Sequence, residues 1–172
     1  SSVGVTAIDK RPASGAVRIG AYGTYADVQA DRKHHGGLDK ALYAYAQEEA
    51  EFWADELGRP LPPGFFGENL RTEGIDVNAA RIGEVWRIGE RVEVAVTMPR
   101  TPCQTFARWV GGDDEQGWVK RFSRERRLGP YLRVVSGEKG KLRNTLAVGV
   151  SYAIEDYEME TGQLLRLPGG AL

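Results

Sequence analysis

Cysteine is almost absent from this chain, and so are long hydrophobic runs and an excess of charge of either sign. One residue of the 172, Cys103, is a cysteine, so no internal disulfide is expected and a reducing compartment such as the cytoplasm is the expected location. The apolar stretches are too short to span a bilayer, and the first residues lack the features of a signal peptide. With 23 basic and 24 acidic residues, the net charge suggests no nucleic-acid partner.

Glycine, by contrast, is abundant. The 22 glycines are about twice the usual share of roughly 7%, and they lie scattered between short apolar runs. This spacing is typical of the tight turns of a β-rich fold, and the length fits one domain with an ample core. The sequence therefore predicts a single α+β domain, mainly β, with a closed or nearly closed barrel. Strands are expected at 3–8, 16–19, 82–88, 92–98, 131–135 and 146–154.

Two of these strands form a predicted hairpin. Apolar and polar residues alternate over 92–98, which indicates a strand with one buried face. The preceding strand, 82–88, is separated from it by residues 89–90, a glycine-first pair that suits a two-residue turn. Earlier in the chain, residues 65–70 are expected to form a loop with an apolar anchor and a polar tip.

Three helices are predicted. Apolar residues recur at helical spacing over 38–57, and Gly58 follows as a stop signal. Shorter helices are expected over 104–110 and 118–128. The outer face of the last helix is basic; such a face is most often solvated, and the alternatives are that it holds phosphate or docks an acidic partner. Its basic residues are Lys120, Arg124, Arg126, Arg127 and Arg121.

The single thiol lies where a strand ends and a helix begins. Pro99 and Pro102 hold the backbone extended ahead of Cys103 and remove two hydrogen-bond donors. A helix N-terminus favours the thiolate, which is a nucleophile and a soft metal ligand. The alternative is a small buried hydrophobic residue, which is the commoner role for a free cysteine.

A second candidate segment is the run of two histidines and two glycines at 34–37. Glycines let the backbone approach a ligand closely, and free N–H groups at a helix start bind anions such as phosphate. A turn with solvent-facing histidines is about as probable from the pattern alone. A zinc site is disfavoured, because no ligand pair has the required spacing. The carboxylates of 27–31 suit a role in orienting the histidines, although a solvated charged loop is the commoner explanation. Residues 67–70 could supply amide donors, although a β-turn is the commoner explanation there.

Several known motifs are missing. The chain has no nucleophile elbow, no P-loop and no dinucleotide fingerprint. From the residues alone, the prediction is a soluble β-rich domain with a candidate thiolate and an anion-friendly loop.

A set of segments, taken together, resembles the MOSC family, which is named after the C-terminal domain of molybdenum cofactor sulfurase. The similarity is to its stand-alone bacterial branch and covers residues 3–136. Departures lie at Ala26, where the family usually has glycine, and from residue 136 onward, where the expected Gly-Asp turn is missing. The matching segments are QADRKHHGGLDKALYAY (29–45), FGENLRTEGID (66–76), ARIGEVWRIGERVEV (80–94), PRTPCQTF (99–106), GWVKRF (117–122) and GPYLRV (129–134).

The resemblance implies a β-barrel with a few packed helices that binds a molybdopterin-type molybdenum cofactor, with Cys103 as the thiolate ligand of molybdenum and the catalytic residue. The implied activity is that of an oxidoreductase, independent of pyridoxal phosphate, which reduces N-hydroxylated small molecules to an amine and water. Because the chain has no flavin or iron–sulfur signature, a separate reductase is expected to supply electrons. The implied cofactor-binding residues are Asp31, Arg32, His34, His35, Gly36, Gly37, Lys40, Asn69, Arg100 and Thr105.

Two other functions fit the same sequence. One is sulfur or cofactor carriage with a persulfide on Cys103, and the other is a non-catalytic binding barrel that has lost the cofactor. The first interpretation makes two structural predictions. Cys103, His34 or His35, and Asn69 should meet in one cleft, and the start of the 38–57 helix should face an anion pocket near Arg32, Lys40 or Arg100.

Overall fold

The computed structural model describes residues 7–12, 14, 17–25, 27, 36–89, 91–112 and 117–136. The predicted strand at 146–154 and most of the one at 3–8 lie outside these ranges. Among the described residues, no helix is both long enough and apolar enough to cross a membrane.

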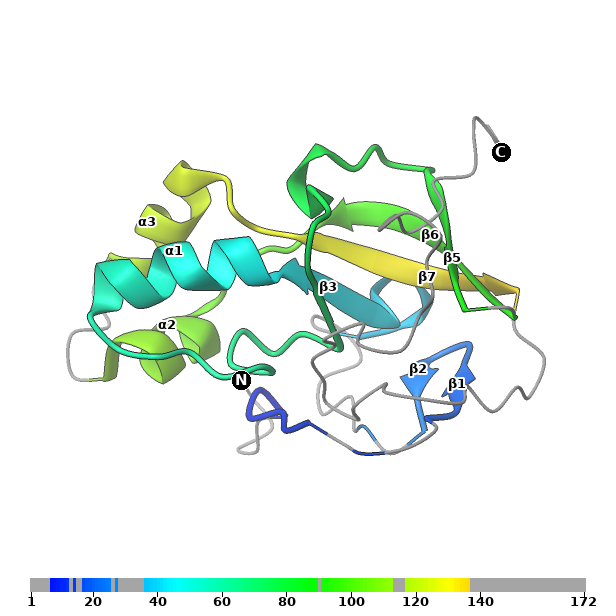
Figure 1. The fold of residues 1–172 in the computed structure, drawn as a ribbon, viewed down its shortest axis with the longest axis horizontal. Helices are drawn as coiled ribbons and strands as arrows, with labels where there is room; N and C mark the ends of the chain where they lie inside the picture. The colour runs from blue at the N-terminus through cyan, green and yellow to red at the C-terminus, as the bar shows by residue number, and fades with distance from the viewer. Residues whose placement is uncertain are drawn as a thin grey trace.

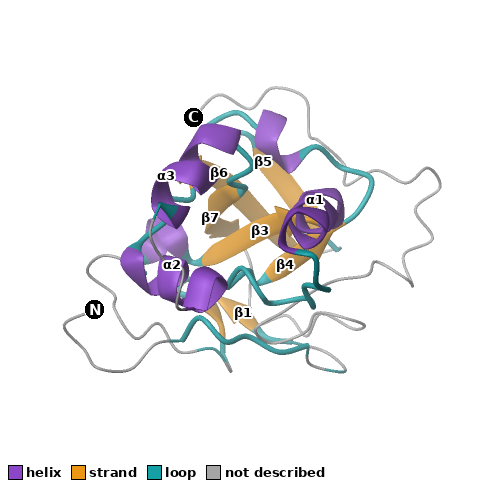
Figure 2. Ribbon diagram, turned by 90° about the vertical axis from the view of Figure 1, so that its left-hand side faces the viewer, coloured by secondary structure: helices purple, strands orange, loops and turns teal. Residues whose placement is uncertain are grey.

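Five strands form a curled mixed sheet, which confirms the predicted α+β, mainly β class. Their order is β4-β3-β7-β6-β5, and the pairing is antiparallel except between β3 and β4. Figure 2 shows the sheet curving into a half-barrel, with a short β1–β2 ribbon beside it. The strands are β1 Ile19–Gly20, β2 Gly23–Thr24, β3 Leu42–Ala46, β4 Leu70–Thr72, β5 Val85–Ile88, β6 Val92–Pro99 and β7 Pro130–Ser136.

In the described part of the chain, three α-helices gather at one end of the sheet, on the left in Figure 1. They are α1 Gln47–Leu57, α2 Gln104–Gly111 and α3 Trp118–Glu125, and two single 3-10 turns are η1 Leu38–Lys40 and η2 Val77–Ala79. The predicted helix at 104–110 is confirmed. The one predicted at 118–128 ends three residues early, because Arg126 adopts the left-handed conformation as its C-cap.

The helix predicted over 38–57 is wrong in its first half. Residues 38–40 form one 3-10 turn, 42–46 are strand β3 at the interior of the sheet, and the helix begins at Gln47. All five residues of β3 are buried. A strand that is buried on both faces loses the alternation that marks a half-exposed strand, and its continuous apolar run merged with the true helical pattern that follows.

The two faces of β3 divide the buried residues into two clusters. Leu42 and Ala44 lie with Val94 and Leu132 in an aliphatic core on one face of the sheet. The other face, which the helices cover, is built around aromatic side chains and includes Tyr43, and we call it the aromatic core. Its aromatic members also include Tyr45, Trp53, Phe66, Phe106, Trp118, Phe122 and Tyr131.

The predicted β5–β6 hairpin is confirmed, with Ile88 opposite Val92. This register leaves a three-residue loop in place of the predicted two-residue turn, and Gly89 there has φ of +61°. Near its other end β6 carries a register shift against β7, with Val96 opposite Leu132 and Met98 opposite Tyr131. The extra residue, Thr97, moves Met98 from the aliphatic side to the aromatic core, as a bulge does next to many functional sites.

Replacing Arg126 by glycine is expected to stabilise the protein by about 0.5–1 kcal/mol. Arg126 is the one non-glycine residue with positive φ (56°) among the described residues, and a left-handed side-chain-bearing residue costs roughly 1–2 kcal/mol, part of which glycine's larger unfolded-state entropy offsets. Urea unfolding measures the change. Arg124→Gly, inside the same helix, is the control and should lower the stability by about 1 kcal/mol; equal effects of the two variants would contradict the prediction.

Candidate functional site

Cys103 lies at the N-cap of α2, in the short segment that connects β6 to this helix, as the sequence predicts. Its backbone is extended (φ −133°), and its carbonyl accepts the first helical hydrogen bond, from the N–H of Ala107 at 3.0 Å. The side chain makes no cap hydrogen bond and is half-buried against the aromatic core. The residue is therefore neither fully buried nor fully exposed, and it lies at the edge of the aromatic core.

Arg100 is a buried cation three residues before the thiol. Only 6% of the residue is exposed, and its guanidinium lies 4.5 Å from the ring centre of Phe106 and 5.2 Å from that of Tyr43. Nη1 is fully buried and has no hydrogen-bond partner. Such an unpaired donor is costly unless a ligand satisfies it, so Arg100 is the strongest anion-binding candidate of the predicted residues.

Tyr131, near the start of β7, lies close to the segments that carry Arg100 and Lys40. The backbone N–H of Arg100 donates to Gly129 at 2.9 Å, so the segment before Cys103 runs beside the start of β7. The ammonium of Lys40 lies 5.7 Å from the Tyr131 ring centre. On the opposite strand, the Thr97 hydroxyl is 2.6 Å from the Asp39 carbonyl and 3.0 Å from that of Tyr131, which holds η1, β6 and β7 together.

Three packed tyrosines line this region, and the sequence analysis did not select them. Tyr43 lies 5.5 Å from Tyr131 and 5.9 Å from Tyr45 between ring centres. Burial raises the pKa of all three phenols; for Tyr131 the Arg100 guanidinium opposes this rise, and the charge of Cys103 adds to it. The available signal was the LYAYA run, whose tyrosines alternate with small apolar residues as they do in a strand with two different faces.

Asn69 occupies a structural position between two strands and the N-terminal segment. Its Oδ1 accepts the N–H of Tyr43 at 3.1 Å, its own N–H donates to the Tyr43 carbonyl at 2.8 Å, and Nδ2 donates to Asp27 at 2.8 Å. Asp27 also pairs with Lys10. The amide is thus used within the fold, and cofactor binding by Asn69 stays a prediction that no contact here supports.

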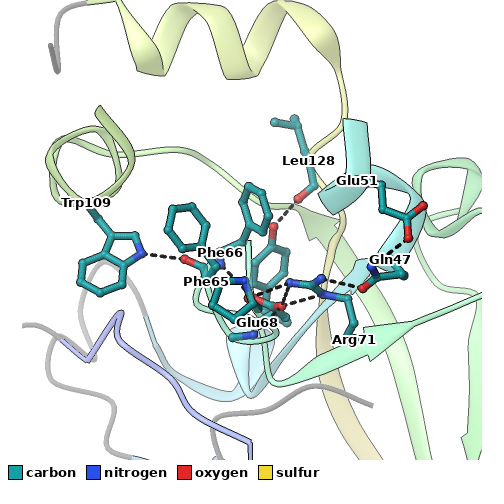
Figure 3. Close-up of polar contacts among 11 residues, drawn as sticks. Gln47, Glu51, Phe65, Phe66, Glu68, Arg71, Trp109 and Leu128 are labelled. Carbon is teal, nitrogen blue, oxygen red and sulfur yellow. Dashed lines mark hydrogen bonds and ion pairs between the residues drawn. The ribbon is translucent and has the colours of Figure 1, made fainter. Parts of the chain in front are cut away.

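The loop predicted at 65–70 is present up to residue 69, but its polar residues Glu68 and Asn69 are buried, Glu68 fully. The Glu68 carboxylate accepts the N–H groups of Gly64 at 2.8 Å and Phe66 at 2.9 Å, and it pairs with the buried guanidinium of Arg71. Arg71 in turn donates to Gln47 at 2.9 Å (Figure 3). These residues fix the 62–69 loop against β3 and α1 and therefore serve the fold.

The predicted anion pocket at the start of a helix is also corrected. Behind Gly37 there is one 3-10 turn, and α1 begins ten residues later at Gln47. A single turn has no sustained dipole to offer an anion. Gly37 does have positive φ (92°). The 37–40 segment contacts the aromatic core through Lys40, which lies beside the ring of Tyr131.

The remaining predicted residues divide into two groups. Thr105 is half-buried in the first turn of α2, and Gly36 lies just before η1. Four others lie outside the described residues, so the predicted meeting of a histidine with Cys103 stays a prediction. They are Asp31, Arg32, His34 and His35.

The basic face of α3 is partly used within the fold. Arg121 pairs with Glu56 and stacks on Trp118, and Arg127 pairs with Glu49 and stacks on Phe52 at 4.0 Å. These two arginines therefore pack α3 and the loop after it against α1.

Comparison with known sequences finds one matching family model and several related proteins. Residues 31–151 match the MOSC domain. The uncharacterized protein YflK of Bacillus subtilis is 39% identical over 137 residues, which are 80% of this chain and 59% of that protein. Protein YiiM of Escherichia coli is 36% identical over 102 residues, 57% of this chain and 45% of that protein, so the chain spans about half the length of these bacterial relatives. A Gibberella moniliformis protein named Reductase is 32% identical over 76% of this chain and 23% of its own length.

Solved structures agree with these matches. YiiM from Geobacillus stearothermophilus superposes with a TM-score of 0.64 at 28% identity and covers 84% of this chain and 65% of that one. The fold of YiiM from Escherichia coli is also similar, with a TM-score of 0.61 at 23% identity over 81% of this chain and 67% of that one. The sequence match over 31–151, with which the similarity of fold agrees, shows that this chain belongs to the MOSC domain family.

Proposed function

We propose that this chain binds a molybdenum cofactor of the molybdopterin type and serves as a reductase of N-hydroxylated small molecules. The observation that carries the proposal is the pairing of a half-buried lone thiol, Cys103, with a buried guanidinium, Arg100, whose Nη1 has no partner. A soft thiolate and an unpaired cationic donor are the two groups that a sulfur-bound metal on an anionic cofactor requires.

The donor set fits a metal whose other ligands come with a cofactor. Within the described residues, no three histidine, cysteine or acidic side chains gather to hold a metal ion. A single protein thiolate is therefore the arrangement to expect if the remaining coordination is supplied from outside the chain. The relative named Reductase supports a redox role.

The roles of this chain's own residues follow from their chemistry. Cys103 would donate its thiolate to the metal, and Arg100 would bind an anionic group of the cofactor through the free side of its guanidinium. Lys40 adds positive charge beside the ring of Tyr131. The cofactor, when bound, supplies the two-electron redox chemistry, and the aromatic core beside the thiol keeps water from that side.

The overall reaction consumes two electrons and two protons. R–NHOH gives R–NH2 and water, with cleavage of the N–O bond. We propose that the electrons come from a separate reductase protein and that the protein works in the cytoplasm, where its free thiol stays reduced.

Metal analysis and mass spectrometry of native protein test the proposal. Protein from cells that make the cofactor should contain about one molybdenum per chain and should reduce an N-hydroxylated base with reduced viologen as donor, whereas protein from cofactor-deficient cells should do neither. Persulfide on Cys103 without molybdenum would instead support sulfur carriage. Neither molybdenum nor persulfide would support the non-catalytic binding barrel.

A further inference from the structure

The three tyrosines beside the candidate site differ in how their hydroxyls are used. Tyr43 donates to the carbonyl of Leu128 at 2.7 Å, and Tyr45 donates to that of Arg127 at 2.9 Å. Both hydroxyls therefore hold the loop between α3 and β7. Among the residues that the structure describes, the Tyr131 hydroxyl has no comparable partner, although the residue is 9% exposed and belongs to the same core.

Tyr131 belongs to the aromatic core, against which Cys103 also packs. The β7 position of Tyr131 pairs with Met98, which the bulge at Thr97 moves to the aromatic face, where Tyr131 also lies. The groups that act on it electrostatically are Arg100 and Cys103, and Lys40 lies over its ring. A phenol carries its proton at neutral pH, so the hydroxyl is a hydrogen-bond donor.

We propose that Tyr131 is a substrate-binding residue whose hydroxyl donates a hydrogen bond to the oxygen of the substrate's N–O group. This inference rests on the proposed function and names how that site recognises its substrate class. A hydroxyl that no described residue accepts a hydrogen bond from, on a side chain that is 9% exposed, favours ligands that carry an acceptor. A ligand without one displaces water from the hydroxyl and leaves the donor unsatisfied. The site should therefore favour the N-hydroxylated compound over the amine or amidine that lacks the oxygen.

Equilibrium binding without an electron donor tests this, because no turnover then occurs. Wild-type holoprotein should bind N-hydroxybenzamidine more tightly than benzamidine. Tyr131→Phe should weaken binding of N-hydroxybenzamidine by about 5- to 10-fold, the loss of one neutral hydrogen bond, and leave benzamidine binding and molybdenum content unchanged. The matched control is Tyr45→Phe, whose hydroxyl is already bound to the chain, and it should leave the preference intact.

Three outcomes would overturn the inference in distinguishable ways. If the wild type binds and reduces N-hydroxybenzamidine but Tyr131→Phe binds it equally well, the inference fails and the proposed function stands. Equal weakening for both ligands would show that Tyr131 has only a structural role. If wild-type protein from cells that make the cofactor contains no molybdenum and binds neither ligand, the proposed function fails together with the inference.

As a second measurement, protein labelled with 3-fluorotyrosine reports on the hydroxyl directly. The fluorine resonance that is missing from Tyr131→Phe should shift when N-hydroxybenzamidine is added to the wild type, and benzamidine should leave it in place. An unchanged resonance with both ligands would contradict the proposed contact even if the phenylalanine variant were less stable.

Discussion

Cys103→Ser is expected to lose most of its molybdenum and to reduce N-hydroxylated substrates on the order of 100-fold more slowly or worse. A serine hydroxyl is a hard, poorly ionised group in place of a soft thiolate, and the loss of even an outer-shell partner of a metal site costs about 10–100-fold. Metal analysis and the viologen-coupled assay measure the two effects at matched protein concentration.

The fold of this variant should be nearly unaffected. Cys103 is half-buried at the start of α2 and makes no cap hydrogen bond through its side chain, and serine is an equally small residue that is favoured at an N-cap. We expect a stability change within about 1 kcal/mol. Thr101→Ser, at an exposed position in the same loop, controls for disturbance of the loop and should retain both metal and activity. Equal turnover by Cys103→Ser at matched molybdenum loading would remove the thiol from the mechanism.

Glu68→Gln is expected to lower the free energy of unfolding by about 3–5 kcal/mol, because it leaves the Arg71 guanidinium buried without its counter-charge. Arg71 is 1% exposed and Glu68 is fully buried. Against a total stability of about 5–15 kcal/mol for an ordinary domain, this loss is large. Urea unfolding followed by tryptophan fluorescence measures it.

Glu73→Gln is the matched control for this experiment, because Glu73 is an exposed carboxylate five residues away. It should change the stability by less than about 0.5 kcal/mol. The double variant Glu68→Leu/Arg71→Met should recover only part of the loss: it removes the unpaired charge, but it leaves the N–H groups of Gly64 and Phe66 without the carboxylate that binds them. A loss below about 1 kcal/mol in Glu68→Gln would show that the pair contributes little.

The ion pair of Glu68 with Arg71, together with the contacts of Asn69, also explains why part of the predicted site is structural. The 67–70 segment is predicted to supply amide donors, with Asn69 as a cofactor-binding residue. In the fold, Glu68 is neutralised by Arg71, and the Asn69 amide is divided between Tyr43 and Asp27. The partners of Asn69 lie 26 and 42 residues away, and no local pattern reports on such distant partners.

Local sequence patterns by themselves determined the β5–β6 hairpin, the helix after Cys103 and the place of the thiol at its N-cap, because alternation, turn glycines and prolines act over a few residues. The family followed from segments that the chain carries in order. The tertiary structure alone decided that residues 42–46 are a strand and not a helix, since β3 gains its hydrogen bonds from β4 and β7, distant in sequence. It also decided that Arg100 is buried against Tyr43 and Phe106, because the bulge at Thr97 and the pairing of β6 with β7 set which side chains share a face.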